Sequence, residues 1–257
     1  MVTDAYQDSR GNKDRSITRP GGGTMSAGTA SGERPDTAHA FLVGDTMSGG
    51  YGTGPDILHD CTIAVDPGEI AVIVGPNGAG KSTAMKAVFG MLNLRKGAVR
   101  LDGQDITALS PQDRVIAGMG FVPQTSNIFP SLTVEENLEM GAFIRTDDIA
   151  GTMAQVFELF PILRDKRRQA AGELSGGQRQ QVAVGRALMT KPKVLMLDEP
   201  TAGVSPIVMD ELFDRIIEVS RTGIPILMVE QNARQALEIA DKGYVLVQGR
   251  NAHTGTG

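Results

Sequence analysis

Several residue types that would point to other classes of protein are scarce in this sequence. It has one cysteine, three histidines and no tryptophan among 257 residues. Cys61 therefore has no partner for an internal disulfide, which is typical of a protein in a reducing compartment. Because Cys61 alternates with the apolar residues Ile63 and Val65, we predict that its thiol is buried in a strand.

Basic residues are also fewer than acidic ones. Lys and Arg together number 25 against 30 Asp and Glu, which gives a formal net charge of -5. Proteins that bind nucleic acid usually carry a basic field that attracts the phosphate backbone, so we expect no nucleic-acid partner. The remaining composition, 40% hydrophobic and 21% charged, is that of an ordinary globular domain.

Long apolar runs are absent from the sequence as well. No run approaches the ~20 residues with which a helix crosses a bilayer. The longest, residues 70–74 and 194–197, have the length of buried strands. The amino terminus lacks the apolar core of a secretory signal peptide. We therefore expect a soluble chain that acts at a membrane only through separate membrane subunits.

The first 38 residues differ in composition from the rest. They are rich in Gly, Ser, Thr and Asp and carry charges of both signs, so they bury too little apolar surface to offset the entropy of ordering. We predict a disordered N-terminal tail over residues 1–38. The remaining residues, 39–257, are enough for one α/β domain with a small insertion.

Short apolar runs alternate with helical patterns along this domain. Strands are predicted at residues 41–43, 61–65, 70–74, 120–123, 194–197, 224–229 and 244–247. Continuously apolar strands are typical of parallel sheets that are covered on both faces. Val208, Leu212, Ile216 and Val219 recur at helical spacing. Strands that alternate with helices predict a doubly wound sheet.

The stretch from about residue 125 to 172 interrupts this alternation. It contains helical patterns at residues 134–143 and 149–160 and no convincing strand. We interpret it as a small helical subdomain inserted into the α/β core.

A glycine-rich loop directly follows the apolar run at residues 70–74. Its residues are Gly75, Pro76, Asn77, Gly78, Ala79, Gly80, Lys81, Ser82 and Thr83, which match the phosphate-loop pattern in its strand-loop-helix setting. The glycines let backbone N–H groups converge on phosphate, and a helix N-terminus adds its positive end. Lys81 would bind the β- and γ-phosphates, and the Ser82 hydroxyl would bind Mg²⁺.

Two acids end the apolar run at residues 194–197. Asp198 would hold Mg²⁺, and Glu199 would orient or deprotonate the attacking water. Taken alone, such a pair is as readily explained by helix capping. Together with the phosphate loop, it predicts a nucleotide-hydrolysing site.

The segment Glu173-Leu174-Ser175-Gly176-Gly177-Gln178 resembles the LSGGQ signature of the ABC ATPases. Ser175 would also cap a helix whose first N–H groups form a second anion site. The resemblance covers about residues 41–250. It implies the ABC cassette fold, which is a P-loop NTPase with a mainly parallel sheet core, an antiparallel β subdomain and an inserted helical subdomain.

The resemblance also implies roles for single residues. Tyr51 stands where the family places an aromatic ring against adenine, although a surface turn tyrosine is the plainer alternative. Gln124 matches the glutamine that reaches Mg²⁺ next to the helical subdomain. ATP and Mg²⁺ are the implied ligands. In the family, two cassettes pair head to tail, so Ser175, Gly176, Gly177 and Gln178 would close over the γ-phosphate held by the partner. Residues 201–206 occupy the D-loop position without its usual aspartate.

The sequence departs from most of the family at the switch histidine. None of its histidines stands at that position, which Gln231 occupies. A glutamine amide can donate to the γ-phosphate but cannot act as an acid or base near neutral pH. Gln231 is therefore predicted as a phosphate contact, and more of the proton chemistry depends on Glu199.

The segments at residues 129–138 and 229–241 are similar to the LivF-type cassette of branched-chain amino-acid importers. This similarity implies a second, paralogous cassette, two transmembrane permease subunits, an extracytoplasmic substrate-binding protein, and a peripheral location on the cytoplasmic face of the plasma membrane. A urea or amide importer and a lipid-extracting or export system stay open as alternatives. DNA-repair and translation proteins of the family are disfavoured, because the helical insertion is short and the chain has one cassette. A non-hydrolysing scaffold is disfavoured by Lys81, Asp198 and Glu199.

Overall fold

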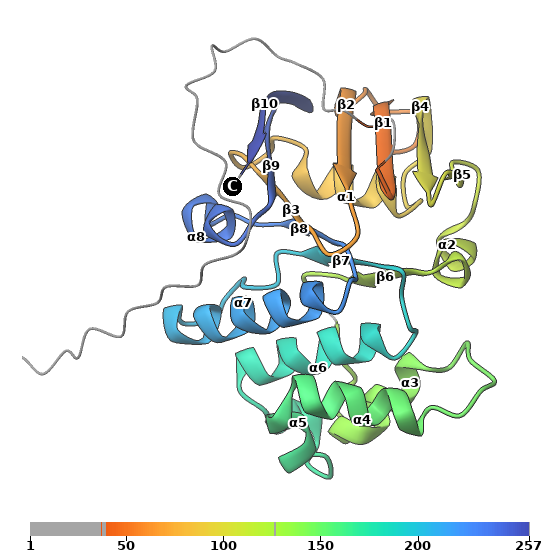
Figure 1. The fold of residues 1–257 in the computed structure, drawn as a ribbon. Helices are drawn as coiled ribbons and strands as arrows, with labels where there is room; N and C mark the ends of the chain where they lie inside the picture. Colours follow the sequence, from red (N-terminus) through yellow and green to blue (C-terminus); the bar gives the residue numbers. More distant parts are fainter. Residues whose placement is uncertain (1–36, 38–39, 126, 257) are drawn as a thin grey trace, which may run out of the picture. The chain divides into compact units, whose positions relative to one another are not determined.

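The computed structural model describes residues 37, 40–125 and 127–256 (Figure 1). Apart from Thr37, the predicted disordered tail lies outside these residues. Two sheets and a group of helices make up the described domain.

The first sheet has four antiparallel strands in the order β2-β1-β4-β5. Its strands are β1 (Leu42–Gly49), β2 (Leu58–Val65), β4 (Leu94–Leu101) and β5 (Gln104–Asp105). Strand β2 contains the predicted run at residues 61–65, and β1 overlaps the predicted run at 41–43 from residue 42 onward; both strands are longer than predicted. Cys61 on β2 is fully buried, as predicted. Burial raises the pKa of its thiol to about 12, so the thiol is protonated and inert.

The second sheet has six strands in the order β10-β9-β3-β8-β7-β6. They are β3 (Ile70–Val74), β6 (Met119–Val122), β7 (Val194–Asp198), β8 (Ile226–Val229), β9 (Lys242–Val247) and β10 (Arg250–Thr256). All pairings are parallel except that of β10 with β9. Every parallel strand overlaps a strand predicted from an apolar run. The edge strand β10 was missed because its residues are polar and largely exposed.

The helices are α1 (Lys81–Val88), α2 (Pro111–Ala117), α3 (Val134–Gly141), α4 (Ala150–Leu159), α5 (Pro161–Asp165), α6 (Gly176–Leu188), α7 (Pro206–Arg221) and α8 (Ala233–Glu238), with a short 3₁₀ turn at Ala171–Glu173. Helices α3 to α6 lie together, away from β1, β2 and β4 (Figure 1). Helices α3 and α4 correspond to the patterns predicted at residues 134–143 and 149–160. Among the described residues, no helix is both long and apolar enough to span a membrane.

Two hydrophobic clusters cover opposite faces of the six-stranded sheet. Ala71 and Ile73 of β3 pack with α1 and the antiparallel sheet, whereas Ile70 and Val72 pack with α6, α7 and the helices beyond them. Because both faces are buried, each apolar residue of such a strand contributes roughly 1.5–3 kcal/mol wherever it points. This double burial explains why the central strands read as continuous apolar runs, and it confirms the predicted fold class.

Candidate active site

The loop between β3 and α1 lines a pocket of about 370 Å³. Residues 77–83 form most of its wall, and Ile57 and Glu199 complete it. Gly78 and Gly80 have φ angles of +77° and +95°, a left-handed conformation that other residues adopt at a cost. The N-cap of α1 is Gly80, which offers no side-chain cap, so the N–H groups of the first turn stay available to a ligand.

The turn between β9 and β10 supports this loop from behind. Gln248 and Gly249 have φ angles of +48° and +73°, the conformation of a tight hairpin turn. The Gly249 N–H donates to the Ala79 carbonyl at 2.8 Å. A side chain at Gly75 would meet the Leu246 carbonyl oxygen at 2.3 Å, and one at Gly80 would meet the Gly249 Cα at 3.3 Å. The loop glycines are therefore needed for packing as well as for φ.

Lys81 and Ser82 open α1 on the floor of the pocket. The Lys81 ammonium donates to the carbonyls of Gly75 and Pro76 at 2.9 and 3.2 Å, within its own loop. The Ser82 hydroxyl donates to Asp198 Oδ1 at 3.2 Å, which joins α1 to the end of β7. Burial, together with the charge of Glu199, raises the pKa of Asp198, and the Ser82 hydrogen bond opposes this rise.

Three predicted residues from different strand ends meet at Glu199. The side-chain amides of Gln124 and Gln231 each donate to Glu199 Oε2 at 2.7 Å. These residues follow β6, β7 and β8, which are neighbours in the parallel sheet, so their carboxyl ends share one edge. Glu199 itself has a φ of +49°, a strained value of the kind that persists where the surroundings hold it.

Glu230 is a residue of this edge to which we assigned no role from the sequence. It directly follows β8, and its carboxylate accepts bonds from the Thr201 N–H and hydroxyl at 3.0 and 2.8 Å. It is buried at 2% exposure. An acid that directly follows an apolar strand is the same pattern that singled out Asp198 and Glu199, so the signal was present in the sequence.

The signature residues lie at the start of α6 and do not line the phosphate-loop pocket. The Ser175 hydroxyl accepts from the Gln178 N–H at 3.3 Å, and Gln178 Oε1 accepts from the Ser175 N–H at 3.2 Å. This capping box is the helix start predicted from the sequence. A side chain at Gly177 would lie 1.9 Å from Val208 Cγ1, so glycine lets α6 approach α7 closely.

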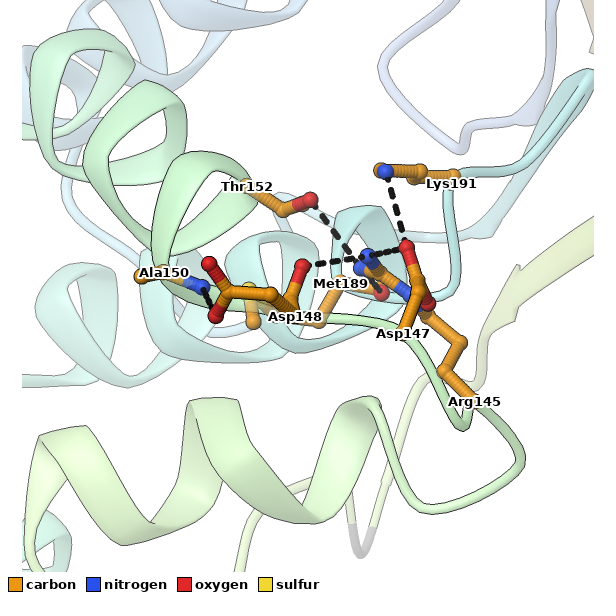
Figure 2. Close-up of polar contacts among 7 residues, drawn as sticks. All are labelled: Arg145, Asp147, Asp148, Ala150, Thr152, Met189 and Lys191. Carbon is orange, nitrogen blue, oxygen red and sulfur yellow. Dashed lines mark hydrogen bonds and ion pairs between the residues drawn. The ribbon is translucent and has the colours of Figure 1, made fainter.

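The other end of α6 is held by Arg145 (Figure 2). Its guanidinium donates to the Met189 carbonyl at 2.8 Å and to the Thr152 hydroxyl at 3.0 Å. Asp147 pairs with Arg145 at 2.7 Å and with Lys191 at 3.2 Å. Hydrogen bonds from these two cations hold the pKa of Asp147 well below its usual range. The signature helix is thus fixed at both ends by polar contacts.

Tyr51 lies apart from the other predicted residues. It is 47% exposed and does not line the phosphate-loop pocket. The Lys86 ammonium of α1 lies 5.9 Å from the centre of its ring. The ring therefore lies beside α1 with a large part of its surface open to solvent, where it can stack on a flat ligand.

The arrangement suits magnesium-assisted phosphoryl transfer. A hydroxyl and a carboxylate, hard oxygen ligands of the kind that Mg²⁺ prefers, are already adjacent at Ser82 and Asp198. Among the described residues, no cluster of three or more His, Cys, Asp or Glu side chains could hold a metal ion. A Mg²⁺ ion held by Ser82 and Asp198 would complete its coordination with water and with phosphate oxygens of the substrate, as is usual for this ion.

Comparisons with known proteins agree with this site. The sequence model of the ABC transporter family matches residues 58–202. The chain is 43% identical to the high-affinity branched-chain amino acid transport ATP-binding protein BraG of Pseudomonas aeruginosa, over 78% of this chain and 86% of that protein. It is 44% identical to the probable branched-chain amino acid transport ATP-binding protein LivF of Archaeoglobus fulgidus, with the same coverage.

A solved structure of an ATP-binding cassette has a similar fold. The ADP conformation of MJ1267, an ATP-binding cassette of an ABC transporter, superposes with a TM-score of 0.79 at 30% identity and covers 85% of this chain and 91% of that one. The phosphate loop, the paired acids and the signature helix all occur in this chain in the family's order. The chain therefore belongs to the ABC transporter family, as an ATP-binding cassette that hydrolyses ATP.

Proposed function

We propose that this chain is the ATP-hydrolysing subunit of an importer for branched-chain amino acids. The observation that carries the proposal is its identity of 43–44% to two proteins named as branched-chain amino acid transport ATP-binding proteins, over 78% of the chain. Gln231 at the switch position, within the LivF-like segment at residues 229–241, supports the same subfamily.

ATP would enter the pocket at the phosphate loop. The N–H groups at the start of α1 would bind its phosphates, and Lys81 would exchange its contacts with the Gly75 and Pro76 carbonyls for the β- and γ-phosphates. Tyr51 would stack on the adenine. Ser82, Asp198 and Gln124 are the residues that would hold Mg²⁺, which when bound neutralises charge on the phosphates.

Glu199 would orient the attacking water and accept its proton. The Gln124 and Gln231 amides, both within 2.7 Å of Glu199 Oε2, would keep the carboxylate aimed at the pocket. Gln231 would donate to the γ-phosphate once substrate is bound. Because an amide does not titrate near neutral pH, Glu199 remains the proton acceptor of this edge.

The signature residues would serve a second cassette. Ser175, Gly176, Gly177 and Gln178 lie outside the chain's own phosphate pocket, which supports a head-to-tail pair with a paralogous cassette. The pair would act on the cytoplasmic face of the plasma membrane, on two permease subunits fed by an extracytoplasmic binding protein. Closing and reopening the pair would drive the conformational cycle.

Uptake of labelled leucine, isoleucine, valine and urea tests the proposal. Cells that express wild type are compared with cells that express Glu199→Gln at equal level. ATP turnover should fall about 100-fold, since general-base catalysis contributes about 10²–10⁴-fold. Uptake of the three amino acids should fall with it, and urea uptake should not. Loss of urea uptake would instead identify a urea importer. Unchanged uptake of every compound, in cells without a second importer, would overturn the proposal and direct the test to export.

A further inference from the structure

Glu230 combines deep burial with a charge that the proposed mechanism leaves unused. Glu230 is 2% exposed and directly follows Val229, the last residue of β8. Its backbone N–H donates to the Ile73 carbonyl at 3.2 Å, which anchors it to the strand that precedes the phosphate loop. Burying a carboxylate is costly unless donors surround it, so its contacts need a reason.

The hydrogen bonds of the Glu230 carboxylate go to two residues next to Glu199, which are Thr201 and Gln231. Oε1 accepts from the Thr201 N–H at 3.0 Å and from the Thr201 hydroxyl at 2.8 Å. Oε2 accepts from the Gln231 N–H at 3.2 Å. Thr201 is itself 4% exposed. In this dry setting a hydrogen bond to a charged acceptor is stronger than one between neutral groups.

Thr201 and Gln231 are both close to Glu199, one along the chain and the other through a hydrogen bond. Thr201 follows it by two residues, and the Gln231 side chain donates to its Oε2 at 2.7 Å. Glu199 has a left-handed φ of +49°, which costs about 1–3 kcal/mol and persists only where neighbours impose it. The Glu230 carboxylate thus binds the backbone two residues after Glu199, at Thr201. It also binds the backbone of Gln231, whose side chain contacts Glu199.

The segment that begins at Thr201 also leads to the signature helix. Beyond Thr201 the chain passes through Val204, whose Cγ1 would lie 3.9 Å from a side chain at Gly176. The segment at residues 201–204 therefore runs from the catalytic acid to the chain's own signature helix. Its start is bound by Glu230.

We propose that Glu230 is a positioning residue for ATP hydrolysis, which sets the geometry of Glu199 by binding Thr201 and Gln231 together. It does not touch the nucleotide. The inference rests on the proposed role of Glu199, and it predicts that turnover depends on Glu230 while ATP affinity does not.

Glu230→Gln is the sharpest variant because it keeps the size of the side chain. An amide has one acceptor end, so its NH₂ must face either the Thr201 donors or the Gln231 N–H. In the transporter complex purified through this chain, kcat for ATP should fall about tenfold, equivalent to about 1.4 kcal/mol. KM for ATP should stay within about twofold, because the phosphate-loop contacts are untouched. Thr201→Val should lower kcat in the same direction, and the double variant should be no worse than Glu230→Gln.

Tyr244→Phe is the matched control. The Tyr244 hydroxyl is a buried polar group that bonds the Ala64 backbone at 2.8 and 3.0 Å, away from Glu199. It should lower thermal stability with unchanged kcat. If Glu230→Gln behaves like this control, the positioning role is overturned while Glu199→Gln, assayed alongside, still loses turnover. If Glu199→Gln keeps full turnover, the role of Glu199 fails and the positioning role fails with it.

Discussion

Helices α1 and α6 both begin at a candidate phosphate contact, yet their N-termini are built in opposite ways. Helix α1 follows Gly80 with no side-chain cap, and its first residues line the chain's own pocket. Helix α6 starts with a complete capping box between Ser175 and Gln178. At the first end no side chain caps the helix, whereas at the second the Ser175 hydroxyl already binds the Gln178 N–H.

The C-terminal ends of the two helices are both bound by an arginine, again in different settings. Arg114 is 2% exposed and donates to the carbonyls of Ala87 and Val88 at the end of α1. It also binds the Thr107 and Leu109 carbonyls, and burial lowers the pKa of its guanidinium. Arg145 binds the Met189 carbonyl at the end of α6 but pairs with an exposed acid at the surface (Figure 2).

The two settings differ in how firmly each helix end is held. Helix α1 lies between two sheets with a buried cap and is part of the core. Helix α6 lies in the core on the other face of the sheet, and the arginine at its end pairs with the exposed Asp147. We infer that the arginine at the end of α1 contributes more to the stability of the fold than the arginine at the end of α6. The following predictions test that contrast, from the largest effect to the smallest.

Removing the two arginines should have unequal effects on stability. Arg114→Met removes hydrogen bonds to four carbonyls, two of them buried at the end of α1, and should cost about 3–5 kcal/mol of unfolding free energy. Arg145→Met should cost about 1–2 kcal/mol, since it removes hydrogen bonds to fewer carbonyls and its ion-pair partner Asp147 is exposed. Urea unfolding of both variants with matched m-values measures the difference. Equal losses would show that the two helix ends are held alike and would contradict the contrast.

Two replacements at Ser175 should separate capping from phosphate binding. Ser175→Ala should destabilise the chain by about 1 kcal/mol, and Ser175→Gly by only a few tenths, because glycine is tolerated at an N-cap. ATP turnover should fall to a similar extent in both, since both lack the hydroxyl. Turnover that follows stability across wild type and the two variants would mean that Ser175 is only a cap.

The surface pair at the end of α6 should give the smallest and most pH-dependent effect. Because the folded chain holds the pKa of Asp147 below its usual value of about 3.9, its ionised form stabilises the fold above that pH. This contribution is lost as the pH falls below about 4 toward the folded pKa. Thermal unfolding of Asp147→Asn should therefore differ from wild type at pH 7 by less than either arginine variant, and the difference should shrink at pH 3. A difference that persists unchanged at pH 3 would assign another role to this side chain.

The elements that were predictable share a local signature. The phosphate loop directly follows a fully apolar strand, and the same is true of Asp198 and Glu199. Helix α6 begins at a serine followed three residues later by a glutamine. Each pattern lies within a few residues, so local backbone preferences decide it.

What was missed depends on distant parts of the chain. Strand β10 is polar because it is an edge strand, and it pairs with β9 only after a tight turn at Gln248 and Gly249. That turn supports the phosphate loop through the Ala79 carbonyl, which residues 75–83 alone do not indicate. Glu230 was visible as an acid after a strand, but its partner Thr201 lies 29 residues away.

The local sequence was enough to recognise the family and its nucleotide chemistry, and it predicts which residues carry that chemistry. Only the tertiary structure decided which of them meet. Gln124, Glu199 and Gln231 are brought together because β6, β7 and β8 lie side by side in the sheet. The signature residues lie outside the chain's own pocket, at the start of a helix that packs against α7 through Gly177. Strand order and helix packing depend on contacts between residues far apart in the sequence, and no local pattern records them.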